Sequence, residues 1–215
     1  MYTLFYSPGT ASMVIHLALL EIGAPHVLKL VDIEQNQQKD PAYLKLNPNG
    51  VVPTLVVDDQ VYIESAAILM MLSEKYPEAA LAPAVNTADY HRWRQWIISL
   101  SHNLQATYRF WFYPQELGYT EHPEHVRQAL QTRIGKIWDQ LDAHLHAHGP
   151  YLLGDTFSSA DLYLTMLMRW SRNMPRPATE WPALNRLIQL VVHRPSWKTM
   201  MQIEAVDVWP KDNQQ

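Results

Sequence analysis

The sequence predicts a two-domain protein, with an α/β N-terminal domain followed by an all-α C-terminal domain built as a helical bundle. Strand-like and helical segments alternate in the order βαβ and then ββα within about the first eighty residues. A segment with prolines at both ends, residues 77–83, comes next, and beyond it apolar residues recur only at helical spacing. We therefore expect domains at residues 1–78 and 88–215, joined by a linker at residues 79–87.

The N-terminal elements follow from local patterns. Residues 2–6 are aromatic and apolar and break at a Pro-Gly pair, which predicts a strand that ends in a turn. Apolar residues then recur at three and four positions as far as Gly23, which predicts a helix with a glycine C-cap. Residues 27–31 predict a second strand, and residues 54–57 and 61–63 predict a hairpin.

The remaining elements are expected to be helical. One helix opens at Ser65 and stops at Pro77. Residues 88–103 predict a second helix, and residues 125–148 predict a third with one apolar face. The segment SSAD at residues 158–161 predicts a capping box that starts a further helix, with Asp in the place where Glu or Gln is usual.

Composition narrows the function classes. Hydrophobic residues make up 47% of the 215 residues, which is enough for a substantial core. The net charge of -4 and the scattered basic residues argue against nucleic-acid binding. The chain has no cysteine, which excludes disulfides and thiolate metal sites, and we expect no metal. We see no signal peptide and no membrane span, so a cytoplasmic protein is expected.

A proline before an apolar run and a nearby helix start predict a site for a small anionic peptide. Pro53 cannot donate a backbone hydrogen bond, so it predicts a strand edge or the first residue of a strand. Such an edge leaves the backbone of Val52 free to pair with an extended ligand. Ser65 opens a helix whose first amide groups attract a carboxylate, and Glu64 beside it suits an ammonium group.

Four short motifs lie along the chain in a fixed order. They are YSPG at residues 6–9, NPNGVVPTL at residues 47–55, ESAAI at residues 64–68 and GDTFSSAD at residues 154–161. Together they resemble the motifs of the cytosolic glutathione transferase family. The first is most similar to the bacterial beta-type members, and the last is similar to the helix-nucleating motif of the family's C-terminal domain. The resemblance covers essentially the whole chain.

This resemblance implies a thioredoxin-like fold for the N-terminal domain and glutathione as the co-substrate. It implies an enzyme, a glutathione S-transferase of detoxification that adds the glutathione thiolate to small apolar electrophiles and acts as a homodimer. Val52, Pro53, Glu64 and Ser65 are then the residues that bind the tripeptide. The alternative is a non-catalytic relative that keeps the fold as a ligand-binding or interaction protein.

A hydroxyl group is expected to stabilise the thiolate, because Ala11 stands where beta-type members of the family have their cysteine. Thr10 is favoured as the donor, since it follows Gly9 in the turn and lies at the start of the helix. Ser12 and Tyr6 are the alternatives. Each of the three side chains also has a structural interpretation, as a helix cap or as a core residue.

Two features of the C-terminal half complete the predicted site. In beta-type relatives a histidine at the position of His102 approaches the glutathione sulfur, so the resemblance implies that His102 contacts the ligand. The aromatic run at residues 108–113, together with Met166 and Trp170, provides either an apolar wall for the electrophile or helix packing.

Overall fold

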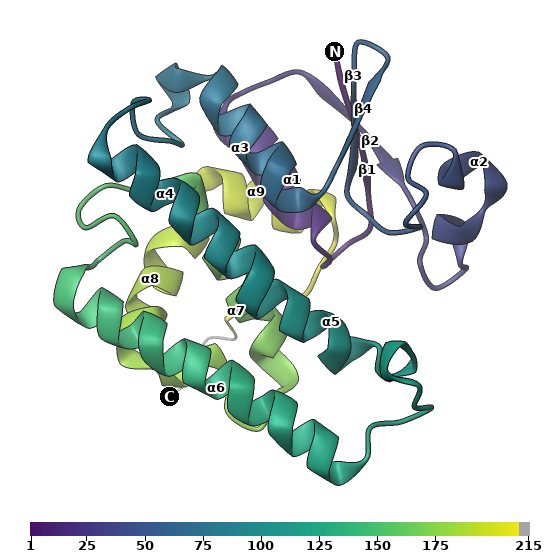
Figure 1. Cartoon of the computed structure of the whole chain (residues 1–215). Coiled ribbons are helices and arrows are strands. Elements are labelled where there is room, and N and C mark those ends of the chain that lie inside the picture. Colours follow the sequence, from purple (N-terminus) through teal and green to yellow (C-terminus); the bar gives the residue numbers. More distant parts are fainter. Residues whose placement is uncertain (211–215) are drawn as a thin grey trace. The chain divides into compact units, whose positions relative to one another are not determined.

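The computed structural model describes residues 1–210 (Figure 1). Its contacts divide this part of the chain into two compact units. The N-terminal unit contains Met1–Ala82 and also the segment that starts at Val192, and the helical unit is Pro83–Val191. Residues 211–215, which the sequence analysis assigns to the C-terminal domain, lie outside the described residues.

A four-stranded mixed sheet forms the centre of the N-terminal unit. Its strands are β1 (Tyr2–Tyr6), β2 (His26–Leu30), β3 (Thr54–Val57) and β4 (Gln60–Ile63), and their order across the sheet is β2-β1-β3-β4. β1 pairs parallel to β2 and antiparallel to β3, and β3 pairs antiparallel to β4. The α/β class expected for this domain is confirmed.

Pro53 lies immediately before β3, which begins at Thr54. The prediction that Pro53 is the first residue of a strand is therefore off by one residue. The alternative interpretation, a strand edge, is wrong. β3 has β1 on one side and β4 on the other, and the outer strands of the sheet are β2 and β4. The missing N–H of the proline removes no hydrogen bond from the sheet, because the pairing of β3 begins only at Thr54.

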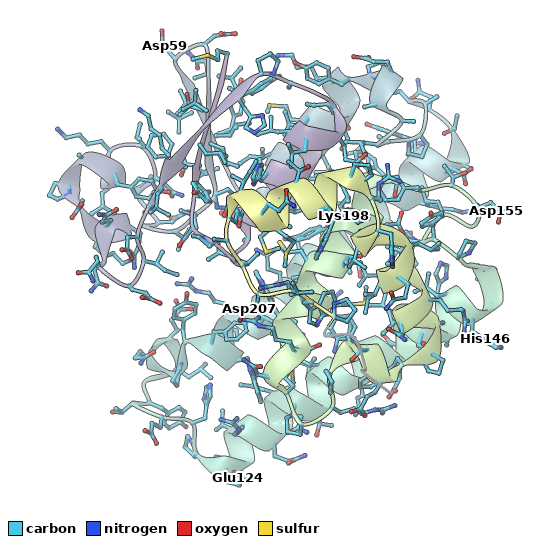
Figure 2. The ribbon with its side chains drawn as sticks, turned by 180° about the vertical axis from the view of Figure 1, so that it is seen from behind. Asp59, Glu124, His146, Asp155, Lys198 and Asp207 are labelled. Carbon is cyan, nitrogen blue, oxygen red and sulfur yellow. The ribbon has the colours of Figure 1, made fainter. Side chains whose placement is uncertain are left out.

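Four helices belong to this unit: α1 (Ser12–Glu21), α2 (Pro41–Leu44), α3 (Ser65–Lys75) and α9 (Pro195–Ile203). α1 packs against both α3 and α9, and its first eight residues are all buried. A helix that is buried on all sides carries apolar residues on every face. The apolar repeat at three and four positions, from which this helix was predicted, describes only one of those faces. Figure 2 marks α9 at Lys198.

The helical unit contains the remaining long helices. They are α4 (Ala88–Ser99), α5 (Ala106–Phe112), α6 (Glu124–His148), α7 (Ser159–Trp170) and α8 (Pro182–Val192), with a π-helical segment at Leu100–Gln105 between α4 and α5. Short 3-10 turns lie at Gln37–Lys39, Pro77–Ala79, Pro114–Leu117, Ser171–Asn173 and Ala178–Glu180. The helix predicted at residues 88–103 therefore continues further than expected, because the π-helical segment carries it into α5.

The core of the helical unit is aromatic. Trp93, Trp138 and Tyr163 are completely buried, and the indole N–H of Trp93 donates to the Ser159 hydroxyl at 3.0 Å. Such a bond lets a large amphipathic ring fill the core without leaving its polar atom unsatisfied. In residues 1–210, no helix is both long enough and apolar enough to cross a membrane.

The predicted capping box at the start of α7 is confirmed. Asp161 Oδ2 accepts hydrogen bonds from the Ser158 N–H at 2.8 Å and from the Ser158 hydroxyl at 3.1 Å. Its other oxygen accepts the Leu152 N–H at 2.9 Å. Burial raises the pKa of the Asp161 carboxyl to about 6, although these hydrogen bonds act in the opposite direction.

Candidate functional site

The sheet register brings three of the predicted binding elements to one end of the sheet. Thr54 pairs with Phe5 on one side and with Ile63 on the other. Three segments therefore lie at the same end of the sheet. They are the residues that follow Phe5, the Val52-Pro53 pair that precedes Thr54, and the Glu64-Ser65 pair that follows Ile63. Residues from three separate stretches of sequence meet there because of strand pairing alone.

The turn between β1 and α1 is built around the carbonyl oxygen of Ser7. This oxygen accepts the Thr10 hydroxyl at 2.7 Å, the Ser12 hydroxyl at 3.0 Å and the Thr10 N–H at 3.3 Å. The two hydroxyl oxygens lie 2.9 Å apart, and Ser12 Oγ also accepts the Ser7 N–H at 3.2 Å. The hydroxyl groups of Thr10 and Ser12 thus both form hydrogen bonds inside the turn.

The three candidate donors differ in exposure. Ser12 is completely buried, whereas Thr10 and Tyr6 are partly exposed. Burial raises the pKa of the Tyr6 phenol, and the charge of Glu204 adds to this effect. The phenol therefore stays protonated at neutral pH and has a proton to donate. Ala11 is nearly buried in the same turn.

A buried acid from the C-terminal end of the described chain reaches this turn. Glu204 Oε2 accepts the Gly9 N–H at 3.3 Å, and Glu204 Oε1 lies 2.9 Å from His16 Nδ1. Both side chains of the Glu204–His16 pair are completely buried. Sequence reasoning missed these two residues. The sequence carries a local signal for His16, a histidine surrounded by apolar residues in α1.

Side-chain hydrogen bonds fix the loop before β3 at Val51, next to Val52. The Val51 carbonyl accepts the Tyr43 hydroxyl at 2.7 Å and the Asn47 side-chain amide at 2.7 Å. Within residues 1–210, the N–H and the carbonyl of Val52 itself form no hydrogen bond. The Val52-Pro53 peptide bond is cis. The backbone of Val52 therefore has a donor and an acceptor without a hydrogen-bond partner among the described residues.

Glu64 has an unusual backbone conformation at the start of α3. Its φ of 71° and ψ of 110° lie outside the regions that non-glycine residues usually adopt. Strained conformations of this kind cost about 1 to 3 kcal/mol and cluster at functional sites. The Glu64 side chain is exposed, and Ser65, the first residue of α3, is buried.

The other predicted contacts belong to the helical unit. His102 lies in the π-helical segment with an exposed side chain. The Phe112 ring stacks on Tyr108 with 5.7 Å between centroids, and Trp170 meets Tyr108 edge-on at 5.7 Å. Tyr108 is completely buried, while Phe112 keeps 45% of its surface exposed. The aromatic run therefore contributes both to packing and to the surface of the unit.

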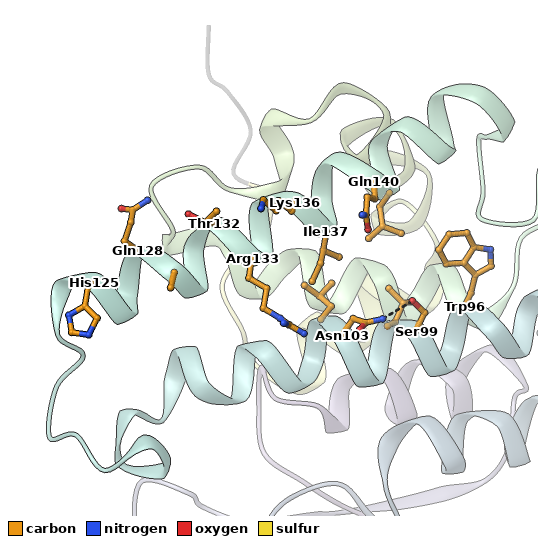
Figure 3. Close-up of a pocket in the computed structure, with 14 residues that line it drawn as sticks. Trp96, Ser99, Asn103, His125, Gln128, Thr132, Arg133, Lys136, Ile137 and Gln140 are labelled. Atoms are coloured by element: carbon orange, nitrogen blue, oxygen red, sulfur yellow. Dashed lines mark hydrogen bonds between the residues drawn. The ribbon is translucent and has the colours of Figure 1, made fainter.

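The helical unit also contains a groove of about 1000 Å³, lined by side chains from α4, the π-helical segment and α6 (Figure 3). Trp96 and Ile137 are among its apolar lining residues, and Arg133 and Lys136 add positive charge. Asn103 in the groove donates to the Ser99 hydroxyl at 3.2 Å. The groove contains none of the residues predicted to bind glutathione or to activate its thiol.

Comparison with known proteins gives matches along almost the whole chain. A model of the glutathione S-transferase N-terminal domain matches residues 10–75, and a model of the C-terminal domain of the same family matches residues 78–195. The glutathione S-transferase GST-4.5 of Xanthomonas campestris pv. campestris is 28% identical over 95% of this chain and 99% of its own length.

Solved structures agree with this result. A glutathione transferase homologue from Sulfitobacter with bound glutathione is 25% identical, has a TM-score of 0.86 and aligns over 96% of this chain and 99% of its own. The bacterial beta-class glutathione S-transferase of Sphingomonas chungbukensis is 28% identical, has a TM-score of 0.83 and aligns over 95% of this chain and 100% of its own. With the thioredoxin-like sheet and the helical unit in place, the chain belongs to the glutathione S-transferase family of enzymes.

Proposed function

We propose that this enzyme adds the glutathione thiolate to small, largely apolar electrophiles. The observation that carries the proposal is the convergence of the Ser7–Ser12 turn, Val52 and the Glu64-Ser65 pair at one end of the sheet. A tripeptide that bears a carboxylate, an ammonium group and a thiol matches these three elements. The family's structures with bound glutathione support the same ligand.

Each element has a distinct part in holding the tripeptide. The backbone N–H and carbonyl of Val52 pair with the extended peptide as an added strand would. Ser65 and the N-terminus of α3 hold a carboxylate, since the helix dipole favours negative charge there. The exposed carboxylate of Glu64 pairs with the ammonium group. Pro53 fixes the chain direction between Val52 and β3.

We propose Thr10 as the donor to the sulfur. Thr10 is partly exposed, whereas Ser12 is completely buried. Turning the Thr10 hydroxyl toward a ligand does not orphan the Ser7 carbonyl, which keeps the Ser12 hydroxyl and the Thr10 N–H as donors. A hydrogen bond to a charged group contributes roughly 1.5 to 3 kcal/mol, so one donor lowers the thiol pKa by about one to two units.

We propose His102 as a residue that contacts the ligand, and the exposed ring of Phe112 as part of an apolar surface that suits the electrophile. Chemistry that depends on reduced glutathione fits a reducing compartment such as the cytoplasm. We also propose a homodimer, which is the commonest symmetric assembly of soluble enzymes.

Conjugation to 1-chloro-2,4-dinitrobenzene tests the proposed reaction. The thiolate forms a C–S bond to the ring carbon that carries chlorine, the C–Cl bond breaks and chloride leaves. We expect catalysed formation of the conjugate, followed by its absorbance, that saturates with glutathione. Saturable binding of glutathione without any turnover of this or related aryl and alkyl halides would instead favour a non-catalytic ligand-binding protein.

A further inference from the structure

We propose that Glu204 is a positioning residue for the thiol-activating turn, holding Gly9 so that the next residue, Thr10, presents its hydroxyl to the glutathione sulfur. This inference rests on the proposed function. It assigns a role in the active site to a residue that follows α9, near the opposite end of the sequence from the turn.

The contacts of Glu204 are those of a side chain built into the turn. One carboxylate oxygen accepts the N–H of Gly9, and the other pairs with His16 inside α1. The carboxylate is completely buried, and a buried charge persists only where hydrogen bonds and partners compensate it. Removing the Glu204 carboxylate therefore removes both the hydrogen bond from Gly9 and the contact with His16.

Gly9 needs such a support because of its backbone conformation. Its φ is 73°, in the left-handed region, and glycine there has more conformational freedom than any other residue. Thr10 follows directly, so a change at Gly9 moves the Thr10 hydroxyl as well. The charge of Glu204 is also felt at the end of β1, where it adds to burial in raising the pKa of Tyr6.

A variant at the other end of α9 provides a control for a purely structural role of Glu204. α9 is fastened to α1 at a second place, where Arg194 donates two hydrogen bonds of 2.7 Å to Glu21 and the Ser196 hydroxyl contacts the same carboxylate. Glu21 is the last residue of α1, at the far end from the turn. Removing the Arg194–Glu21 pair weakens the attachment of α9 to α1 and leaves the contacts of Gly9 unchanged.

The test compares Glu204→Ala with Arg194→Ala in the full chain. Two quantities are measured: the pH at which bound glutathione gains thiolate absorbance, and the separate values of kcat and KM for glutathione. We expect Glu204→Ala to move the thiolate transition to higher pH and to lower kcat at least about tenfold, with a smaller change in KM, since small misplacements of a catalytic group are costly. Arg194→Ala should leave both quantities within about twofold of wild type.

Glu204→Gln provides a second variant that keeps the shape of the side chain. Its amide replaces one of the two carboxylate oxygens with an NH2 group, which donates instead of accepting, so one of the two contacts is changed and we expect a thiolate shift in the same direction but smaller. If Glu204→Ala fails to fold, this variant decides the question alone. Equal effects of Glu204→Ala and Arg194→Ala, or wild-type behaviour of Glu204→Gln, would overturn the inference. Absence of any thiolate signal in the wild type would overturn the proposed function instead.

Discussion

At the scale of single residues, the proposed chemistry depends on the direction in which the Thr10 hydroxyl donates its proton. The Thr10 hydroxyl donates to the Ser7 carbonyl at 2.7 Å, and that carbonyl has two further donors. The hydroxyl can therefore turn to a ligand at little cost. Ser12 is completely buried and supports the turn, which leaves Thr10 as the proposed donor to the sulfur.

Replacing Thr10 by alanine should raise the pKa of the bound glutathione thiol by about one to two units, because the sulfur loses a hydrogen bond of roughly 1.5 to 3 kcal/mol. The measurement is the ultraviolet absorbance of the thiolate across pH in the presence of saturating glutathione. Thr10→Ser keeps the hydroxyl and should stay close to wild type. An unchanged thiol pKa in Thr10→Ala, with a large change in Tyr6→Phe, would move the role to Tyr6.

Asp161 gives a prediction about stability and pH. Its folded pKa of about 6 lies above the ordinary value of 3.8 for an Asp carboxyl, so this carboxyl stabilises the fold fully at low pH and the contribution is lost as pH rises through about 6. At about 1.36 kcal/mol per pKa unit, the loss is roughly 3 kcal/mol. The free energy of unfolding of wild type minus that of Asp161→Asn should therefore fall between pH 4 and pH 6.5, as denaturant titrations can measure. A difference that stays flat or rises would contradict this account.

At the scale of elements, a partly buried ion pair between Arg194 and Glu21 joins the start of α9 to α1. The Glu21 side chain is only 11% exposed, and burial alone would raise its pKa. Hydrogen bonds from Arg194 and Ser196, together with the charge of Arg194, outweigh burial and lower that pKa. The pair therefore stabilises the fold above the ordinary pKa of the carboxyl and loses this effect as pH falls through the lowered value.

Arg194→Ala should lower the free energy of unfolding at pH 7 by about 2 to 4 kcal/mol, because it leaves a largely buried carboxylate without its cation. Chemical denaturation with a spectroscopic probe measures this directly. Lys198→Ala is the matched control on the same helix, since Lys198 is exposed and should change stability by less than about 0.5 kcal/mol. Equal losses in the two variants would show that the pair with Glu21 contributes nothing.

The elements that sequence reasoning found are those with local signals. The hairpin formed by β3 and β4 has Asp58 and Asp59 at its turn, both with positive φ, and Asp tolerates that conformation better than most residues. The capping box of Ser158 and Asp161 lies within four consecutive residues. Short-range patterns of this kind fix where an element starts and ends, independent of the rest of the fold.

Features that depend on distant contacts could not be found in the same way. Glu204 meets Gly9 across a sequence separation of 195 residues, and no periodicity connects them. The same holds for α9, which packs on α1 although it follows the helical unit in sequence. The strand-edge interpretation of Pro53 failed for this reason too, because the position of β3 between β1 and β4 is a property of the whole sheet.

At the scale of the whole molecule, assembly is the first question. A symmetric homodimer should sediment as a single species of twice the 24.9 kDa chain mass across micromolar concentrations. Analytical ultracentrifugation measures this without labels or ligands. A monomeric species over the entire concentration range would remove the dimer from the proposal while leaving the glutathione site of the N-terminal unit in place.

The proposed function requires that glutathione binds at the end of the sheet where the Ser7–Ser12 turn, Val52 and the Glu64-Ser65 pair converge. Titration calorimetry of the purified protein with reduced glutathione tests this claim most directly. We expect saturable heat with one tripeptide per chain at millimolar concentrations or below, and we expect Glu64→Ala to weaken binding, since it removes the partner of the ammonium group. A wild-type protein that gives no saturable heat with millimolar glutathione would contradict the account.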